Sequence, residues 1–557
     1  MRAGLTIYPL STLLAGLALA VPAHAQDGAP VAGAAGGAGD APLAKPRTGG
    51  HGRLKVTPYI EAEQVLTSEL SPGSETLTYT RVAAGVDAAI NGRNTSGAVS
   101  LRYEHRFGWG KNAEDGDTLS GLARVSAAII PRTLTVEAGG MAARTRLDGG
   151  GAFLGGIGDN DEVGHFYSAY AGPSLTTRVG DVGVNASYRL GYSRVDTSGG
   201  DIFSSTGDDA DDSIQHAAQF RAGVKPGDVL PVGLGVGAAW YREDISNFDQ
   251  RIDDFHVRGD VTLPVSQTVA LVGGVGYERV KSSQRDVVRD GAGRPVIDDD
   301  GHYRLDKDAP RQIAYDVDGL IWDVGLLWRP SPRTSLEAHM GRRYGSATYY
   351  GSFSWQASRR SSVNVSVYDS MSGFGGQLNR SLVSLPTDFE AIRDPVSGEL
   401  NGCVGSLKEG SCLTGALGGL RSAIFRARGI SASYAVDMGR ISTGVGIGYE
   451  RRKYVAPRES VLGLIDGVTE KNLWLSAYMR AMLDERSSVT TNFYINRYYS
   501  GLELVGDSTS FGASAAYYRM LTRRLSARAA VGIDGNTRQD DDDYWTATAL
   551  VGMQYAF

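Results

Sequence analysis

Apolar and polar residues alternate along most of the chain. Between Val99 and Trp109 the odd positions are apolar or aromatic apart from His105, whereas positions 100, 102, 104 and 106 are Ser, Arg, Glu and Arg. Successive side chains of a β-strand point to opposite faces, so this segment predicts a strand with one apolar and one polar face. The same alternation recurs at 182–192, 254–263 and 525–534. The chain is therefore expected to be all-β.

The connections between these segments also alternate, short and then long. Residues 130–132 and 178–181 are short turns, whereas 147–162 and 196–213 are long loops. Soluble sandwiches have strands of about 5–6 residues and no reason to sort their loops in this way. Long strands with short turns on one side and long loops on the other are typical of a transmembrane β-barrel. Residues 54–557 thus predict an antiparallel up-and-down barrel of about 22 strands (20–24), with short periplasmic turns and long extracellular loops, rather than a propeller or solenoid.

The first 53 residues predict export. Arg2 precedes the apolar run Leu10–Val21, and Ala23-His24-Ala25 is an A-x-A cleavage site, so residues 1–25 read as a signal peptide. The apolar run is too short for an uncleaved membrane anchor. Residues 26–53 are rich in Gly, Ala and Pro and predict a flexible periplasmic leader. The expected location of the mature chain is the outer membrane.

The last strand carries a predicted assembly signal. Its apolar face includes Trp545, Met553, Tyr555 and the terminal Phe557. An alternating apolar strand that ends in an aromatic residue resembles the C-terminal signal read by the barrel-assembly machinery. That machinery is an expected partner, together with outer-membrane lipids and lipopolysaccharide.

Composition narrows the remaining classes. Lys and Arg number 56 against 62 Asp and Glu, a net charge of -6, which gives no basic footprint for nucleic acid. After residue 25 no apolar run is long enough for a membrane-spanning helix. The 74 glycines fall mostly on the inner face in segments such as 233–237 and 444–448, where small residues let strands bend or clear space.

The polar face is expected to line the lumen with mixed charge and without strong ion selectivity. The pore-lining candidates are Arg102, Glu104, Arg106, Arg124, Glu137, Arg189, Arg221, Asp254, His256, Arg258, Asp260, Glu337, His339 and Arg528. The couples Asp254/His256 and Glu337/His339 could do acid–base chemistry in a barrel hydrolase, or could belong to charge networks of the lumen. No histidine makes a metal-binding motif, and no catalytic, cofactor-binding or metal-binding residue is expected.

Cys403 and Cys412 are the only cysteines, and both lie in the connection 370–423. In an oxidising compartment this spacing predicts a local disulfide. This connection is the longest and contains apolar segments at 382–385 and 413–420, so the stapled loop is expected to fold into the barrel mouth and narrow the lumen, with a stabilised surface loop as the alternative.

Four stretches, VTPYIEAEQVLT, TYTRVAAGVDA, EAHMGRRYGSATYYG and RQIAYDVDGLIWD, resemble an uncharacterised family of proteobacterial outer-membrane barrels. Some relatives carry a preprotein-translocase-subunit label, and similar barrels accompany exopolysaccharide genes. The first label conflicts with this chain, because such a subunit has one membrane-spanning helix and no such helix is expected here. The resemblance implies an outer-membrane barrel and no particular functional residue.

Function follows from the predicted lumen. We expect a passive channel for polar solutes and not an enzyme. A conduit or accessory protein for exopolysaccharide export is the alternative, and a barrel-type hydrolase the third reading. TonB-dependent receptors place a plug domain before the barrel, and only 28 residues separate Ala25 from Leu54, so that class is not expected. The oligomeric state stays open.

Overall fold

The computed structural model describes residues 53–110, 113, 115–148, 151–153, 163–197, 209–297, 303–405, 411–412, 422–502, 506–539 and 542–557. The predicted signal peptide and nearly all of the predicted leader lie outside these residues.

The described strands form a barrel wall. One antiparallel sheet has 23 strands, of which β6 (Gly151–Phe153) pairs only with the tip of β5, so 22 strands make the wall. The wall strands are β1 Arg53–Ser71, β2 Thr76–Asn91, β3 Thr95–Trp109, β4 Gly116–Ile130, β5 Leu134–Asp148, β7 Val163–Val179, β8 Val182–Thr197, β9 Asp209–Val224, β10 Gly233–Ile245, β11 Gln250–Pro264, β12 Val269–Gln284, β13 Gln312–Ser331, β14 Thr334–Arg343, β15 Ser346–Ser358, β16 Ser361–Ser372, β20 Phe425–Asp437, β21 Ile441–Tyr454, β22 Thr469–Met482, β23 Ser487–Tyr499, β24 Ser508–Met520, β25 Leu525–Arg538 and β26 Tyr544–Ala556.

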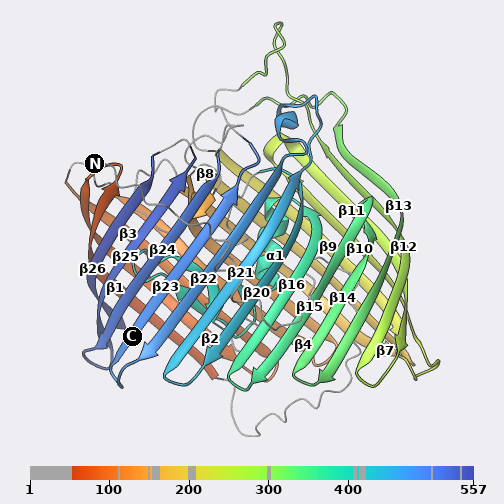
Figure 1. Cartoon of the computed structure of the whole chain (residues 1–557), viewed down its shortest axis with the longest axis horizontal. Helices are drawn as coiled ribbons and strands as arrows, with labels where there is room; N and C mark the ends of the chain where they lie inside the picture. The colour runs from red at the N-terminus through yellow and green to blue at the C-terminus, as the bar shows by residue number, and fades with distance from the viewer. Residues whose placement is uncertain are drawn as a thin grey trace, which may run out of the picture.

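The first and last strands close the barrel (Figure 1). β1 and β26 pair from Tyr59↔Ala556 to Ser71↔Trp545, and the amide of Phe557 donates a 3.0 Å hydrogen bond to the carbonyl of Pro58. Closure leaves every described wall strand with a partner on both sides, as a β-structure in a bilayer requires. The expectation of 22 strands is confirmed.

The outer face of the wall is apolar and the inner face polar. In β3, Leu101, Tyr103 and Phe107 are 40–49% exposed, whereas Arg102 and Glu104 are 3–4% exposed. Met553 and Phe557 in the last strand also lie on the exposed face. A closed barrel with an apolar outer band belongs in the outer membrane, as the alternation predicted. Among the described helices, none is long and apolar enough to cross a membrane.

The predicted sorting of turns holds with four exceptions, two of which are the four-residue connections 72–75 and 246–249 on the long-loop side. The turn between β9 and β10 spans eight residues, 225–232, on the short side. On the long-loop side, β14 and β15 join through only Tyr344 and Gly345, whose φ angles are +53° and +66°. Positive φ at both central residues is typical of a two-residue hairpin turn. On the long-loop side, the edge of the wall is therefore low at this hairpin, because no loop extends beyond it.

The ladder between β15 and β16 stops early. It runs up to the pair Gly351↔Val367, and residues 346–350 and 368–372 continue without cross-strand pairing to each other. β16 remains paired with β20 along its full length, from Ser361↔Val436 to Ser372↔Phe425. We call the unpaired stretch between β15 and β16 the seam. Two side chains of β20 bridge it: Arg428 donates to the carbonyl of Ala347 at 2.7 Å and Arg426 to the hydroxyl of Ser346 at 2.6 Å.

The connection between β16 and β20 enters the barrel. It contains α1 (Phe374–Val383), β17 (Glu390–Arg393), β18 (Leu400–Gly405) and β19 (Ser411–Cys412), and the last three form a small separate sheet. Figure 1 shows α1 within the ring of wall strands. Two short 3-10 turns, Asn247–Asp249 and Val461–Ile465, lie in long-side connections. We call residues 373–400 the internal segment.

Candidate functional site

The N-terminus of α1 is held by a carboxylate of the wall. Its N-cap residue is Gly373, which has no capping side chain of its own. Glu243 of β10 supplies the acceptor: the amides of Gly373 and Gly376 donate to its two oxygens at 2.7 and 3.0 Å. The hydroxyls of Tyr241 and Ser213 donate to the same carboxylate at 2.5 and 2.8 Å. An anion at a helix N-terminus satisfies free amides and complements the helix dipole, so Glu243 anchors the helix.

Glycine allows α1 to lie against the wall. A Cβ at Gly375 would come within 1.9 Å of the Gln215 side chain, and one at Gly376 within 2.0 Å of the Tyr241 hydroxyl. Further along the helix, the amide of Asn379 bonds to Gln215 and, at 3.3 Å, to Ser193. The helix therefore docks through close backbone approach and buried polar contacts.

The helix also contributes to an apolar core inside the barrel. Phe374, Leu378 and Leu382 lie on one helical face and are at most 1% exposed. They pack in a cluster with inner side chains of several wall strands, including Leu122, Met141, Phe166, Val195, Ile245 and Ile252. Burying three such side chains contributes roughly 1.5–3 kcal/mol each. The interior of this part of the barrel is thus a packed core.

The turn between β17 and β18 docks on another part of the wall. The guanidinium of Arg393 donates to the hydroxyls of Ser120 at 2.7 Å and Ser100 at 3.3 Å. Asp394 accepts the amides of Val396 and Ser397 at 2.8 Å, which fixes the turn, and accepts the Ser514 hydroxyl at 2.5 Å.

Apolar packing adds to this second contact. Val396 packs with Val65, Tyr79, Ala516, Ala530 and Leu550, which belong to β1, β2 and β24–β26. The internal segment therefore spans the lumen from the β7–β10 side to the β1–β4 and β24–β26 side.

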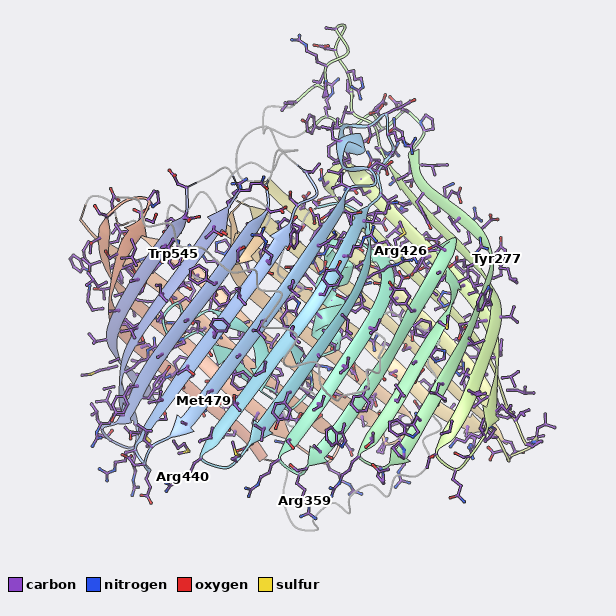
Figure 2. All side chains as sticks on the ribbon, viewed as in Figure 1. Tyr277, Arg359, Arg426, Arg440, Met479 and Trp545 are labelled. Atoms are coloured by element: carbon purple, nitrogen blue, oxygen red, sulfur yellow. The ribbon has the colours of Figure 1, made fainter. Side chains whose placement is uncertain are left out.

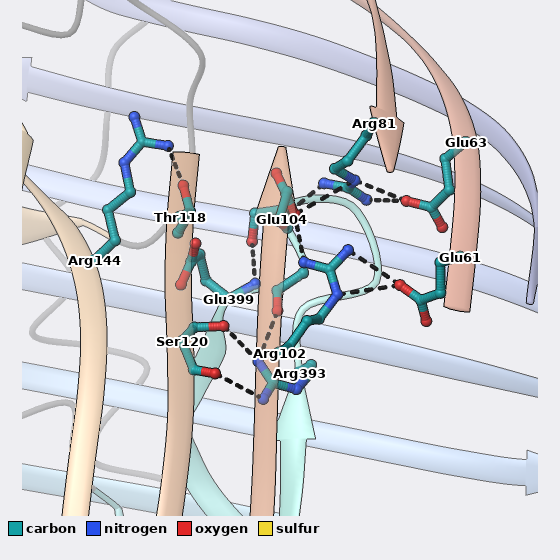
Figure 3. A network of polar contacts seen from close by, with 12 residues as sticks. Glu61, Glu63, Arg81, Arg102, Glu104, Thr118, Ser120, Arg144, Arg393 and Glu399 are labelled. Carbon is teal, nitrogen blue, oxygen red and sulfur yellow. Dashed lines mark hydrogen bonds and ion pairs between the residues drawn. The ribbon is translucent and has the colours of Figure 1, made fainter. Parts of the chain in front are cut away.

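A charge network lines the wall beside this turn (Figure 3). Arg81 pairs with Glu63 at 2.5 Å, and Arg102 pairs with Glu61 at 3.1 Å and with Glu104. Arg528 pairs with Glu63 from β25. Three arginines and three glutamates balance one another, so these wall charges stabilise each other. The segment joins the network through the carbonyl of Ser397, which accepts from Arg81 at 2.9 Å.

Glu399 enters the same region from the internal segment. It is 8% exposed, and its Oε2 atom has no hydrogen-bond partner. Burial, reinforced by the nearby carboxylate of Glu104, raises the pKa of Glu399 from its usual 4.5 to about 7, although Arg144, Arg393 and Arg102 act in the opposite direction. The docked segment therefore favours the protonated form of this carboxyl.

A second network covers the inner face of β9–β14. Arg221 forms a bidentate pair with Asp260 at 2.6 Å, and Arg258 forms one with Asp323 at 2.7 Å. His339 bridges Asp323 at 2.9 Å and Glu337 at 3.1 Å and stacks on Tyr350.

The other predicted acid–base couple belongs to a separate group. Arg343 bonds to Asp254 at 2.8 Å and lies 2.9 Å from the ring of His256. The hydroxyl of Tyr344 donates to Asp254 at 3.1 Å. The bonds found at both histidines are those of charge networks, and no serine takes part in them among the described contacts.

The structure brings the pore-lining candidates together in separate groups. Arg102, Glu104 and Arg528 share the first network; Arg221, Arg258, Asp260, Glu337 and His339 share the second; Asp254 and His256 meet at Arg343. Arg124 and Glu137 form a pair of their own at 3.3 Å. Arg106 (8% exposed) and Arg189 also lie on the inner face of their strands, outside these groups. Their role as pore lining remains a proposal.

The residues that hold the internal segment were missed by sequence reasoning. Glu243, Tyr241 and Gln215 were not singled out, nor were Arg393 and Asp394. The available signal was the pair of glycines at 375 and 376 beside an apolar i, i+4, i+8 pattern, which indicates a helix that packs closely.

Cys403 and Cys412 are opposite each other in the β18–β19 ladder. Directly paired residues of antiparallel strands have Cα atoms about 4.5–5.5 Å apart, within the range that a disulfide bridges. Their side chains lie outside the described part of the chain, so the disulfide stays a prediction.

Comparisons with known proteins extend the description of the fold. No model of a protein family matches the sequence, and no curated protein matches it. Among solved structures, the chain is similar to the FrpB iron transporter from Neisseria meningitidis (10% identity, TM-score 0.43, 89% of this chain and 81% of that chain). It is also similar to the ferric-catecholate import receptor Fiu from Escherichia coli (10%, 0.42, 89% and 81%) and to the copper transporter OprC (12%, 0.39, 91% and 82%). At this identity the likeness concerns the fold alone.

The expectation of a passive channel is wrong. A passive channel needs a water-filled path, whereas this interior holds an apolar core with the internal segment packed in it. Polysaccharide export is supported no better. The material that fills this lumen comes from the connection between β16 and β20. Of the expected resemblance, only the coarser part, an outer-membrane β-barrel, is confirmed.

Proposed function

We propose that the protein is a gated outer-membrane transporter and that the internal segment is its gate. The observation that carries the proposal is the docking of this segment on two separate parts of the wall. Docked in this way, the segment blocks the lumen that a 22-strand wall would otherwise leave wide.

The attachment of the segment suits a movable gate. Its contacts with the wall are hydrogen bonds of side chains and helix-end amides, together with apolar packing, and none belongs to the wall ladder. Its first residue directly follows wall strand β16, and the chain after its last residue passes through β18 and β19 before it reaches wall strand β20. Undocking therefore leaves every ladder between wall strands intact. The inner wall carries charge networks beside the apolar side chains that the segment covers, so we infer that the cargo has polar or charged groups that these networks can contact.

The test is a reversible lock. Ser193→Cys with Asn379→Cys places thiols on the wall and on α1, where the native side chains lie 3.3 Å apart. A short bifunctional thiol reagent that reductant cleaves should join them. Unlocked protein in planar bilayers should be silent and should conduct when urea, below the concentration that unfolds the barrel, weakens docking. Locked protein should stay silent until the link is reduced.

The matched control joins two wall strands. Thr67→Cys with Thr548→Cys links neighbouring residues of β1 and β26, whose hydroxyls are 3.0 Å apart, without holding α1. This pair should open in urea like the wild type. Steady conductance of wild type without urea, or opening of the α1-locked protein, would refute the gate.

A further inference from the structure

The outer surface of the wall carries a dense group of cations at the long-loop ends of β20, β21 and β22. Arg428 is directly opposite Arg451, which is directly opposite Lys471. One step further along, Arg426 is opposite Lys453. Neighbouring strands are about 4.8 Å apart, so these residues lie close together, although the side chains of Arg426 and Arg428 turn toward Asp369 and are only 15% and 27% exposed. We call these five residues the cationic patch. Figure 2 shows Arg426 in the upper half of the wall, toward the long loops.

Little negative charge balances the patch. Asp369 lies beneath it with a fully buried side chain and pairs with Arg426 at 2.6 Å and Arg428 at 3.1 Å. Arg451, Lys453 and Lys471 are exposed, and the described ion pairs include none of them. Like charges directly opposite each other destabilise a sheet. Five cations against one carboxylate are thus an arrangement that an external anion would stabilise.

Other parts of the rim show that the excess of positive charge is confined to the cationic patch. At the same end of the wall, Arg194 pairs with Asp196 at 2.6 Å, and Asp244 pairs with both Arg242 and Arg251 at 2.5–2.6 Å. In those places a carboxylate of the wall itself partners the outward arginines.

The patch lies directly above lipid-facing side chains. The next outward residues along the three strands are Ile430, Tyr449 and Leu473, which are 37–39% exposed and in register with one another. Two residues along a strand span about 7 Å. A bound molecule would therefore meet apolar side chains with one part and cations with the part just above.

We propose that the cationic patch binds the sugar phosphates of lipopolysaccharide in the outer leaflet. The row Arg428, Arg451 and Lys471 contacts the phosphates, and the row Ile430, Tyr449 and Leu473 contacts the acyl chains. Arginine binds phosphate through two parallel N–H groups and lysine binds it as a point charge. Basic residues at a membrane surface attract anionic headgroups.

The test measures lipopolysaccharide retained by the protein purified in mild detergent, by native mass spectrometry. Arg451→Gln, Lys453→Gln and Lys471→Gln together should lower retention at least ten-fold. The control, Arg359→Gln, Arg440→Gln and Arg486→Gln, removes the same charge from exposed residues of the short-turn rim (Figure 2) and should retain the wild-type amount. Heat-modifiable migration on gels checks that both variants are folded.

Adding lipid back identifies the ligand. Intact lipopolysaccharide should rebind to delipidated wild type, whereas dephosphorylated lipopolysaccharide and phosphatidylglycerol micelles should bind at least ten-fold less. Undiminished retention by the patch variant, or equal loss from both variants, would overturn the site. Equal binding of phosphatidylglycerol would overturn its assignment to lipopolysaccharide.

Discussion

Replacing Glu243 by Gln should release α1 while leaving the wall intact. The carboxylate accepts two backbone amides of the helix start, one on each oxygen. Gln has one oxygen and one NH2 group, so in either orientation the amide of Gly373 or Gly376 faces a donor. A lost hydrogen bond to a charged group costs about 1.5–3 kcal/mol, and the lost charge at the helix N-terminus adds about 0.3–1 kcal/mol. The sum, roughly 2–4 kcal/mol, shifts the docked-to-undocked ratio roughly 30- to 700-fold.

The measurement is the urea concentration at which half of the barrels conduct in planar bilayers. Glu243→Gln should lower it clearly. The control is Arg242→Gln on the outward side of β10, where Arg242 pairs with Asp244 and does not contact α1. That variant should open like the wild type. If Glu243→Gln inserts normally and opens at the wild-type urea concentration, the carboxylate does not hold the helix.

The remaining predictions concern titration, register and assembly. Because the docked pKa of Glu399 is about 7 and its usual value is 4.5, docking is strongest below pH 4.5 and weakens as pH rises through 7. The urea concentration that opens the barrel should therefore decrease as the pH is raised from about 5 to about 8, and Glu399→Gln should abolish this decrease. If the pH dependence of the variant equals that of the wild type, Glu399 is not its source. Val257→Arg puts a charge on the lipid face at a cost of about 2–4 kcal/mol and should reduce the amount of heat-modifiable barrel in the outer membrane. Ser187→Arg, on the inner face, should be tolerated. The reverse result would show that the two faces are assigned the wrong way round. Deleting Phe557 should lower outer-membrane insertion and raise periplasmic degradation, and undiminished insertion would show that the terminal residue is not needed.

The wall could be predicted from sequence because each strand carries its own signal. In β3 the alternation of Leu101 and Tyr103 with Arg102 and Glu104 specifies both strand and faces locally. Trp474 shows that parity outweighs residue type: it shares the parity of the inner residues Asn472 and Ser476, and its side chain is 5% exposed.

The docking of the internal segment could not be predicted in this way. Glu243 and Gly376 are far apart in the sequence, and nothing near either residue indicates the other. Glu243 occupies an ordinary inner position of a strand whose other charges pair within the wall. The error about a passive lumen has the same origin, since period-two patterns describe the wall and carry no information about what fills it.

The seam between β15 and β16 gives the wall one place where it can deform at low cost. Parting two paired strands breaks a row of backbone hydrogen bonds, but above Gly351↔Val367 there is no such row to break. Only side-chain bonds such as Arg428 to Ala347 and Arg426 to Ser346 resist separation there. The internal segment begins at Gly373, directly after the end of β16 that is paired with β20 but not with β15. A pull on the internal segment therefore acts on the part of the barrel that deforms most easily. If the segment moves as the proposed gate, strain concentrates at the seam. The other strands then stay rigid.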